Sequence, residues 1–122
     1  MIILDLPWPN SANTHWRHAR GRTYVSPKGV AFREAVKLSA YLHKEVAPEG
    51  RLMVGVELYP PNKRIIDIDN RIKPLLDALT CAGIIIDDSL IDKIIIERRD
   101  IIKEGKCRVF ISSYTPEYNR GE

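Results

Sequence analysis

Acidic side chains gather in the middle of the chain, in the stretch DIDNRIKPLLDAL that begins at Asp67. One isoleucine separates Asp67 from Asp69, and the later segment IIIDD places Asp87 and Asp88 after a short apolar run. If the first stretch is extended, the two-residue period of a strand puts its two carboxylates on one face and the isoleucine against the core. Neighbouring carboxylates repel each other, and a divalent cation between them relieves that repulsion. The acids therefore indicate a metal site to which three carboxylate positions contribute.

Oxygen ligands of this kind suit Mg²⁺ or Mn²⁺, which complete their coordination with water and substrate phosphate oxygens. A phosphodiester is the expected substrate, because such a metal acidifies an attacking water and stabilises charge on the phosphoryl oxygens. Lys73 follows Asp69 by four residues, one helical turn, and can stabilise the same charge. A structural role explains the pattern as well: the acids would cap a helix or form a turn, and the lysine would pair with a neighbouring acid.

A basic, loop-rich arm at residues 7–25 precedes the acidic stretch. The chain as a whole is only slightly basic, with a net charge of +3. Between Leu6 and Arg33, however, it holds no aspartate or glutamate. The basic side chains of this window are Arg17, Arg20, Arg22, Lys28 and Arg33. Lysine and arginine that neutralise phosphates release condensed counterions, so the arm is a candidate contact surface for a nucleic-acid backbone. A solvated loop rich in arginine is an equally good interpretation of composition alone.

Turn residues and the period of the apolar side chains predict the helices and strands that must position these residues. The N-terminal MIILDL is typical of a strand, and residues 7–22 read as a long loop. Ser26 as N-cap and Pro27 at the first helical position predict a helix that runs to about Val46. Residues 51–60 alternate apolar and other side chains, which predicts a strand with one buried face.

The second half of the chain predicts a helix and two strands. An apolar stripe that Gly83 closes indicates the second helix, which begins near Lys73 or bends there because of Pro74. LIDKIIIERRDII and CRVFISSY predict two strands joined through a hairpin at Gly105. The order strand, helix, strand, helix, strand, strand predicts an α/β (α+β) fold, with a single small mixed sheet and two packed helices.

Length and composition bound the class of protein. The chain has 122 residues, of which 44% are hydrophobic and 29% charged, which indicates one globular domain over residues 1–122 with a loose tail at 115–122. No apolar run is long enough for a membrane span, and the N-terminus lacks the features of a signal peptide, so a cytoplasmic protein is expected. Cys81 and Cys107 suit reduced, buried positions better than a disulfide framework or a zinc site.

Three segments carry a resemblance to a known family. LPWPNSANTHWRHARGRTYVS, RIIDIDNRIKPLLDALTCAGIIIDD and the strand pair that follows resemble the RusA family of Holliday-junction resolvases over essentially the whole chain. The resemblance implies that the functional residues are the D-x-D-N carboxylates, one acid of the D-D pair and the following lysine. These fall on Asp67, Asp69, Asp88 and Lys73, with the three aspartates as metal ligands and Asp87 as an alternative ligand. Pro74 stands where an ordinary helix former is expected.

The same resemblance implies an activity. It implies an enzyme that is associated with phages or prophages and acts in recombination and repair. As a homodimer, this enzyme would bind four-way DNA junctions. With Mg²⁺, for which Mn²⁺ can substitute, it would nick two opposing strands symmetrically. The expected DNA-binding side chains are Arg17, Arg20, Arg22, Lys28, Lys63, Arg64 and Arg71. Two alternatives remain open at this point: a non-catalytic protein that binds DNA junctions, and a metal-dependent nuclease that acts on flaps or single strands.

Overall fold

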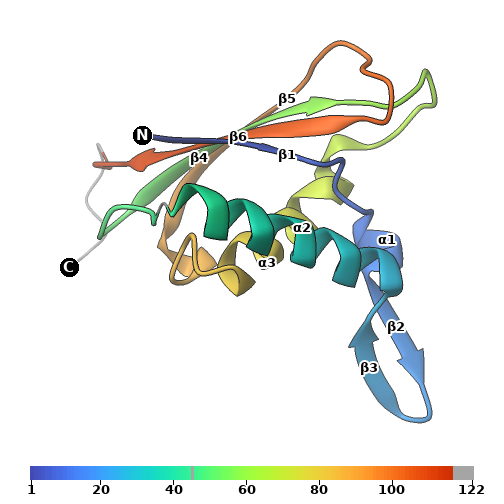
Figure 1. Cartoon of the computed structure of the whole chain (residues 1–122). Helices are drawn as coiled ribbons and strands as arrows, with labels where there is room; N and C mark the ends of the chain where they lie inside the picture. The colour runs from blue at the N-terminus through green and yellow to red at the C-terminus, as the bar shows by residue number, and fades with distance from the viewer. Residues whose placement is uncertain (45, 117–122) are drawn as a thin grey trace.

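A four-stranded mixed sheet forms the centre of the computed structural model, which describes residues 1–44 and 46–116 (Figure 1). Its strands lie in the order β1 (Ile2–Leu6), β6 (Lys106–Ser113), β4 (Leu52–Tyr59) and β5 (Ile91–Arg98). Strand β6 is antiparallel to both of its neighbours, whereas β4 and β5 are parallel. The predicted mixed α+β class is confirmed.

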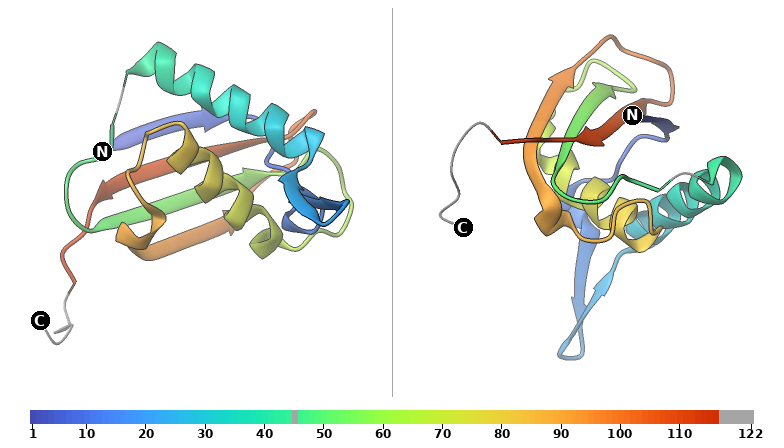
Figure 2. Two further views of the ribbon diagram at one scale, coloured as in Figure 1. Left: turned by 90° about the horizontal axis from the view of Figure 1, so that it is seen from below. Right: turned by 90° about the vertical axis from the view of Figure 1, so that its left-hand side faces the viewer.

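The helices α2 (Pro27–His43) and α3 (Ile72–Cys81) cover one face of this sheet (Figure 2). The alternation predicted for β4 is present, because Leu52, Val54, Val56 and Leu58 are all buried. They pack with buried residues of α3 such as Leu79, and α2 contributes Val36 to the same apolar cluster. The opposite face of the four-stranded sheet is not covered by any described helix.

Local sequence explains where the two helices begin and end. The Ser26 hydroxyl accepts a hydrogen bond from the backbone N–H of Gly29, as an N-cap residue does, and Lys44 adopts a left-handed conformation that ends α2 before Val46. In α3, Pro74 lies within the first turn, where a missing N–H costs no helical hydrogen bond. Gly83, with φ +76°, follows the helix and closes it as predicted.

The arm is more ordered than its sequence indicates. Residues 7–22 were expected as a loop, but they contain the short helix α1 (Ala12–His15) and strand β2 (Trp16–Ala19). Strand β2 pairs antiparallel with β3 (Arg22–Val25), which forms a second sheet and extends the expected single-sheet architecture. Arg20 and Gly21 both have positive φ, as the two central residues of a type I′ hairpin turn do. The hairpin projects away from the main sheet (Figure 1).

Two further expectations are wrong. Strands β5 and β6 do not form a hairpin, because β5 pairs with β4 and β6 lies between β1 and β4. The reason is the crossover through α3, which brings β5 alongside β4 in parallel and leaves the antiparallel edge of β4 for β6. Cys81 is exposed at the end of α3, whereas Cys107 is buried as expected.

Two expectations concern the chain as a whole. The loose tail predicted at 115–122 falls mainly on residues 117–122, which lie outside the described residues. Among the helices that the structure describes, none has the length and apolar character needed to cross a membrane.

Candidate active site

The first two acids flank the start of a short 3₁₀ helix, η1 (Ile68–Arg71). Asp67 is the extended residue before it, and Asp69 lies in its first turn; both are exposed. The expectation that this segment is extended is therefore wrong beyond Asp67, because the backbone already turns toward α3. Ile68 is half-buried and packs against the core as expected, so the turn is fixed by an apolar contact while its acids face solvent.

The third acid meets the lysine. Asp88 begins a second 3₁₀ turn, η2 (Asp88–Leu90), just before β5, and Lys73 lies in the first turn of α3. The Lys73 Nζ atom is 3.5 Å from Oδ2 of Asp88, and both side chains are partly exposed. The structure thus brings together two predicted site residues that are fifteen positions apart in sequence. An ion pair of Lys73 with Asp69 or Asp77, the structural alternative, is not found among the described residues.

Asp87 has a different environment from Asp88. Its Oδ1 accepts a hydrogen bond of 2.9 Å from the backbone N–H of Ser89, so Asp87 caps η2. Hydrogen bonds from Ser89 lower the pKa of the Asp87 carboxyl below its ordinary value. One oxygen of Asp87 is therefore engaged in local structure, which leaves Asp88 as the acid of this pair that faces the lysine.

The structure does not assemble these acids into a closed metal cage. Within residues 1–44 and 46–116, no three His, Cys, Asp or Glu side chains are grouped so that they could hold a metal ion. The convergence of three carboxylates stays a prediction. What the structure provides is two acid-bearing turns, η1 before α3 and η2 after it in the chain, and a contact between Lys73, in the first turn of α3, and Asp88 of η2.

The predicted DNA-binding side chains fall into two groups by exposure. Those on the β2–β3 hairpin, on the first turn of α2 and in the loop after β4 are exposed: Arg17, Arg20, Arg22, Lys28, Lys63 and Arg64. Arg71 differs, because it is half-buried. Its Nη1 donates a 2.8 Å hydrogen bond to the carbonyl of Pro9, and its guanidinium lies 5.1 Å from the centre of the Trp8 ring. Burial lowers the pKa of Arg71 below its ordinary value.

A polar network that the sequence did not reveal anchors the arm. His15, at the end of α1, is 1% exposed, and its Nε2 lies 3.3 Å from Oδ2 of Asp77 on α3. Arg33 of α2 donates a 2.6 Å hydrogen bond from Nε to the same oxygen, and its Nη2 forms an ion pair with that oxygen, also at 2.6 Å. Asn10 Nδ2 lies 2.8 Å from His15 Nδ1. Gly29 makes room for this histidine, since a Cβ there would lie 2.8 Å from His15 Nδ1.

Comparison with known proteins gives a consistent result. A family model described as endodeoxyribonuclease RusA matches residues 7–112. A crossover junction endodeoxyribonuclease RusA of Escherichia coli O139:H28 is 33% identical over 93% of this chain and 96% of its own length. The protein of the same name from Escherichia coli K12 is 33% identical over 89% of this chain and 92% of its length. The one from Enterobacteria phage 82 is 32% identical over the same shares.

Proposed function

The chain belongs to the RusA family of endodeoxyribonucleases, and from that premise we propose that it resolves four-way DNA junctions by paired, symmetric hydrolysis of two phosphodiester bonds. The relatives described above are named crossover junction endodeoxyribonucleases, and the similarity covers most of both chains. The observation in this chain that carries the proposal is the ion pair between Lys73, one helical turn after Asp69, and Asp88 of the second acid-bearing turn. We place the reaction in the cytoplasm, in recombination and repair of DNA.

We assign the chemistry to Asp67, Asp69, Asp88 and Lys73. Asp67 directly precedes the 3₁₀ turn η1 and Asp69 lies within it, and the half-buried Ile68 packs that turn against the core. Asp88 is the preferred third acid, because one oxygen of Asp87 is bound to the backbone of η2. The Lys73 ammonium would bind a phosphoryl oxygen as negative charge develops there, and its partly exposed position lets it exchange Asp88 for the phosphate.

The carboxylates fit a divalent metal in their chemistry. Mg²⁺ is usually held by one or two carboxylates together with waters and substrate phosphates, so a closed three-residue cage is not required before DNA binds. Asp67, Asp69 and Asp88 would hold Mg²⁺, and Mn²⁺, which also accepts oxygen ligands, would substitute. When bound, the cation would acidify an attacking water and stabilise charge on the phosphoryl oxygens.

The basic residues would position the DNA. The hairpin carries Arg17, Arg20 and Arg22 on a projecting element, where they can follow a phosphate backbone without steric conflict from the sheet (Figure 1). Lys63 and Arg64 precede Asp67 closely in the chain and would offset the repulsion between the acids and the DNA. Contacts of this kind fix register but carry no base information, so we expect binding to weaken steeply with salt.

We further propose that the active form is a homodimer. A four-way junction has two equivalent strands to cut, and an isologous interface places two identical sites about one axis. One chain carries a single set of the proposed acids, so paired symmetric nicks require a second copy.

The test is cleavage of a strand-labelled four-way junction by the purified protein, with and without Mg²⁺. Duplex, flap and single-stranded DNA serve as competing substrates under identical conditions. Symmetric paired nicks on the junction alone, dependent on the metal, are expected. Nicks on flaps or single strands instead would favour a different metal-dependent nuclease, and salt-sensitive junction binding without nicks at any Mg²⁺ or Mn²⁺ concentration would favour a binding protein.

Asp69→Asn tests the site itself. This substitution removes one ligand charge and no phosphate contact, so nicking should be abolished while junction affinity is kept or increased. Asp100→Asn is the matched control, because it removes the same charge from an exposed aspartate outside the proposed site. Full cleavage by Asp69→Asn would refute the catalytic assignment.

A further inference from the structure

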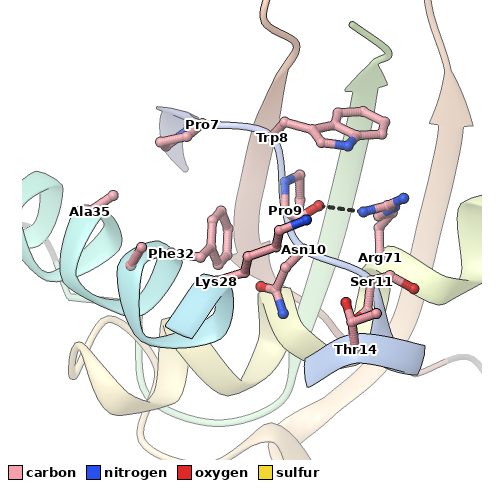
Figure 3. A pocket seen from close by; sticks show the side chains of 11 residues that line it. Pro7, Trp8, Pro9, Asn10, Ser11, Thr14, Lys28, Phe32, Ala35 and Arg71 are labelled. Carbon is pink, nitrogen blue, oxygen red and sulfur yellow. Dashed lines mark hydrogen bonds between the residues drawn. The ribbon is translucent and has the colours of Figure 1, made fainter. Parts of the chain in front are cut away.

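A pocket of about 610 Å³ lies between the segment after β1 and helix α2 (Figure 3). Phe32 forms its wall on the α2 side, and Trp8 and Pro9 form the wall on the other side. Arg71, from η1, also lines the pocket and lies beside Pro9, to whose carbonyl it donates a hydrogen bond. Its volume lies within the range of about 300–1,000 Å³ that is typical of small-molecule sites. The metal chemistry proposed above makes no use of this space.

The walls are suited to a flat, partly polar ring. Phe32 is 4% exposed, and the Trp8 ring is held in place by Arg71 and by close contact with Gly105, where an added Cβ would lie 3.0 Å from the Trp8 Cβ. Aromatic faces and guanidinium planes are the groups on which unpaired bases stack in proteins that bind nucleic acid.

Two polar atoms in the residues that line the pocket lack a partner. Among the described residues, Oδ1 of Asn10 and Nε of Arg71 are buried and accept or donate no hydrogen bond. A buried polar atom without a partner costs free energy, so a ligand that offers both a donor and an acceptor would be favoured here. The edge of a nucleobase offers both.

The position of the pocket ties it to the proposed cleavage site. Arg71 follows Asp69 by two residues and lies in the same 3₁₀ turn. The exposed Lys28, from the first turn of α2, also lines the pocket and would supply a second cation for the phosphate of an entering nucleotide. A strand whose phosphate reached the acids would therefore present its neighbouring bases to this opening.

We infer that the pocket accepts one unstacked nucleobase of the strand that is cut, next to the scissile phosphate. This inference rests on the proposed function and deepens it, because a base held beside the acids would fix the cut position and make the rate depend on that base. At a junction the bases near the crossover are less constrained than in a continuous duplex, which lowers the cost of taking one out of the stack.

The experiment combines protein variants in which a larger side chain fills the pocket with DNA junctions that lack one base. Ala31→Phe and Ala35→Phe each add an aromatic ring to a lining position of α2 without removing a contact, and two variants guard against one that fails to fold. Leu38→Phe is the control, because this exposed residue lies on the same helix and does not line the pocket. Junctions that carry an abasic site, moved one nucleotide at a time around the cut, remove the base instead.

The single-turnover nicking rate with Mg²⁺ is the readout. The wild-type protein should nick one of the abasic junctions about tenfold to a hundredfold more slowly than the intact junction, as expected for the loss of one stacked base. Ala31→Phe or Ala35→Phe should lower the nicking rate on the intact junction by the same factor. On the abasic junction that the wild type nicks slowly, neither variant should lower the rate any further. Leu38→Phe should behave as the wild type.

Two results would overturn the inference while leaving the proposed function intact. One is equal nicking of every abasic junction by the wild-type protein. The other is a filled variant whose loss of nicking rate on the abasic junction is the product of the two separate losses. Such independent effects would show that the missing base does not occupy the filled pocket. Failure of the wild-type protein to nick the intact junction would instead overturn the proposed function and this inference with it.

Discussion

Asp77→Asn tests whether the polar network at the base of the arm holds the arm in place. The carboxylate of Asp77 receives a hydrogen bond and a second ion-pair contact from Arg33 and faces the buried His15, so three separate helices meet at one oxygen. The substitution keeps the shape of the side chain and removes its charge. Asp77 is not among the residues proposed to contact DNA or metal, so any effect on DNA binding must pass through the arm.

The expected loss of stability follows from the exposure of the partners. Hydrogen bonds to a charged group contribute about 1.5–3 kcal/mol each when buried. Arg33 is 24% exposed and can be partly rehydrated, whereas His15 is 1% exposed and cannot. An amide at position 77 still accepts one hydrogen bond from Arg33. We therefore expect the free energy of unfolding to fall by about 2 kcal/mol, in the lower half of the range for hydrogen bonds to a charged group.

Urea unfolding followed by tryptophan fluorescence measures this change. The Trp16 ring lies 5.0 Å from the His15 ring, so its emission also reports on the arm directly. Glu34→Gln is the control: Glu34 pairs only with Lys37 at the surface, among the residues that the structure describes, and its loss should change the free energy of unfolding by less than about 0.5 kcal/mol. The double variant Asp77→Asn/Arg33→Gln should lose less free energy of unfolding than the two single variants lose together, since both substitutions remove the same interaction.

Junction binding gives the functional half of the test. If the network positions the arm, Asp77→Asn should lower junction affinity and reduce its salt dependence, because fewer arm arginines reach phosphates. A variant that unfolds within about 0.5 kcal/mol of the wild type, or a double variant whose losses simply add, would refute the reasoning.

Two further predictions concern single side chains. Arg108 Nε donates a 2.8 Å hydrogen bond to Asp5 across β1 and β6, and this lowers the pKa of Asp5 below its ordinary value of 3.8. The pair therefore contributes stability above pH 3.8 and loses it as the pH falls through the lower, folded pKa. In urea unfolding, Asp5→Asn should be slightly less stable than the wild type at pH 7 and as stable as the wild type at about pH 2. An equal loss of stability at both pH values would contradict a stabilising role of the Asp5–Arg108 pair. Burial raises the pKa of Cys107 to about 12, whereas Cys81 is exposed, so a thiol reagent at about pH 8 should label one cysteine quickly and the second only on unfolding. Rapid labelling of both thiols in the folded protein would contradict the burial of Cys107.

Periodicity and capping chemistry predicted the elements that are locally determined. The serine N-cap of α2, the alternation of β4 and the glycine that ends α3 are each encoded within a few residues, and all three are confirmed. The hairpin in the arm was missed because its strands are exposed and have no apolar alternation, so only the Arg20-Gly21 turn signals it.

Long-range pairing explains the other errors. The choice of β4 over β6 as the partner of β5 depends on where the crossover through α3 places the chain, which no local pattern records. The contact of His15 with Asp77 joins residues 62 positions apart, and the sequence shows only a histidine in a basic loop. The acids were proposed as site residues from their spacing, which stays a prediction, and the placement of Asp67 and Asp69 at a 3₁₀ turn instead of on a strand depends on the packing of Ile68.

The spacing of the proposed catalytic groups is set by the core. Helix α3 buries Leu75, Ala78 and Leu79 completely, so its position on the sheet is fixed by packing. The turn η1 leads directly into this helix, and the chain that follows it is held by the buried Ile84 and by Ile85. The acids themselves contribute almost nothing to that packing, since they lie on exposed turns at the ends of a buried segment. The core therefore fixes the positions of these carboxylates, which the proposed mechanism requires to bind a cation.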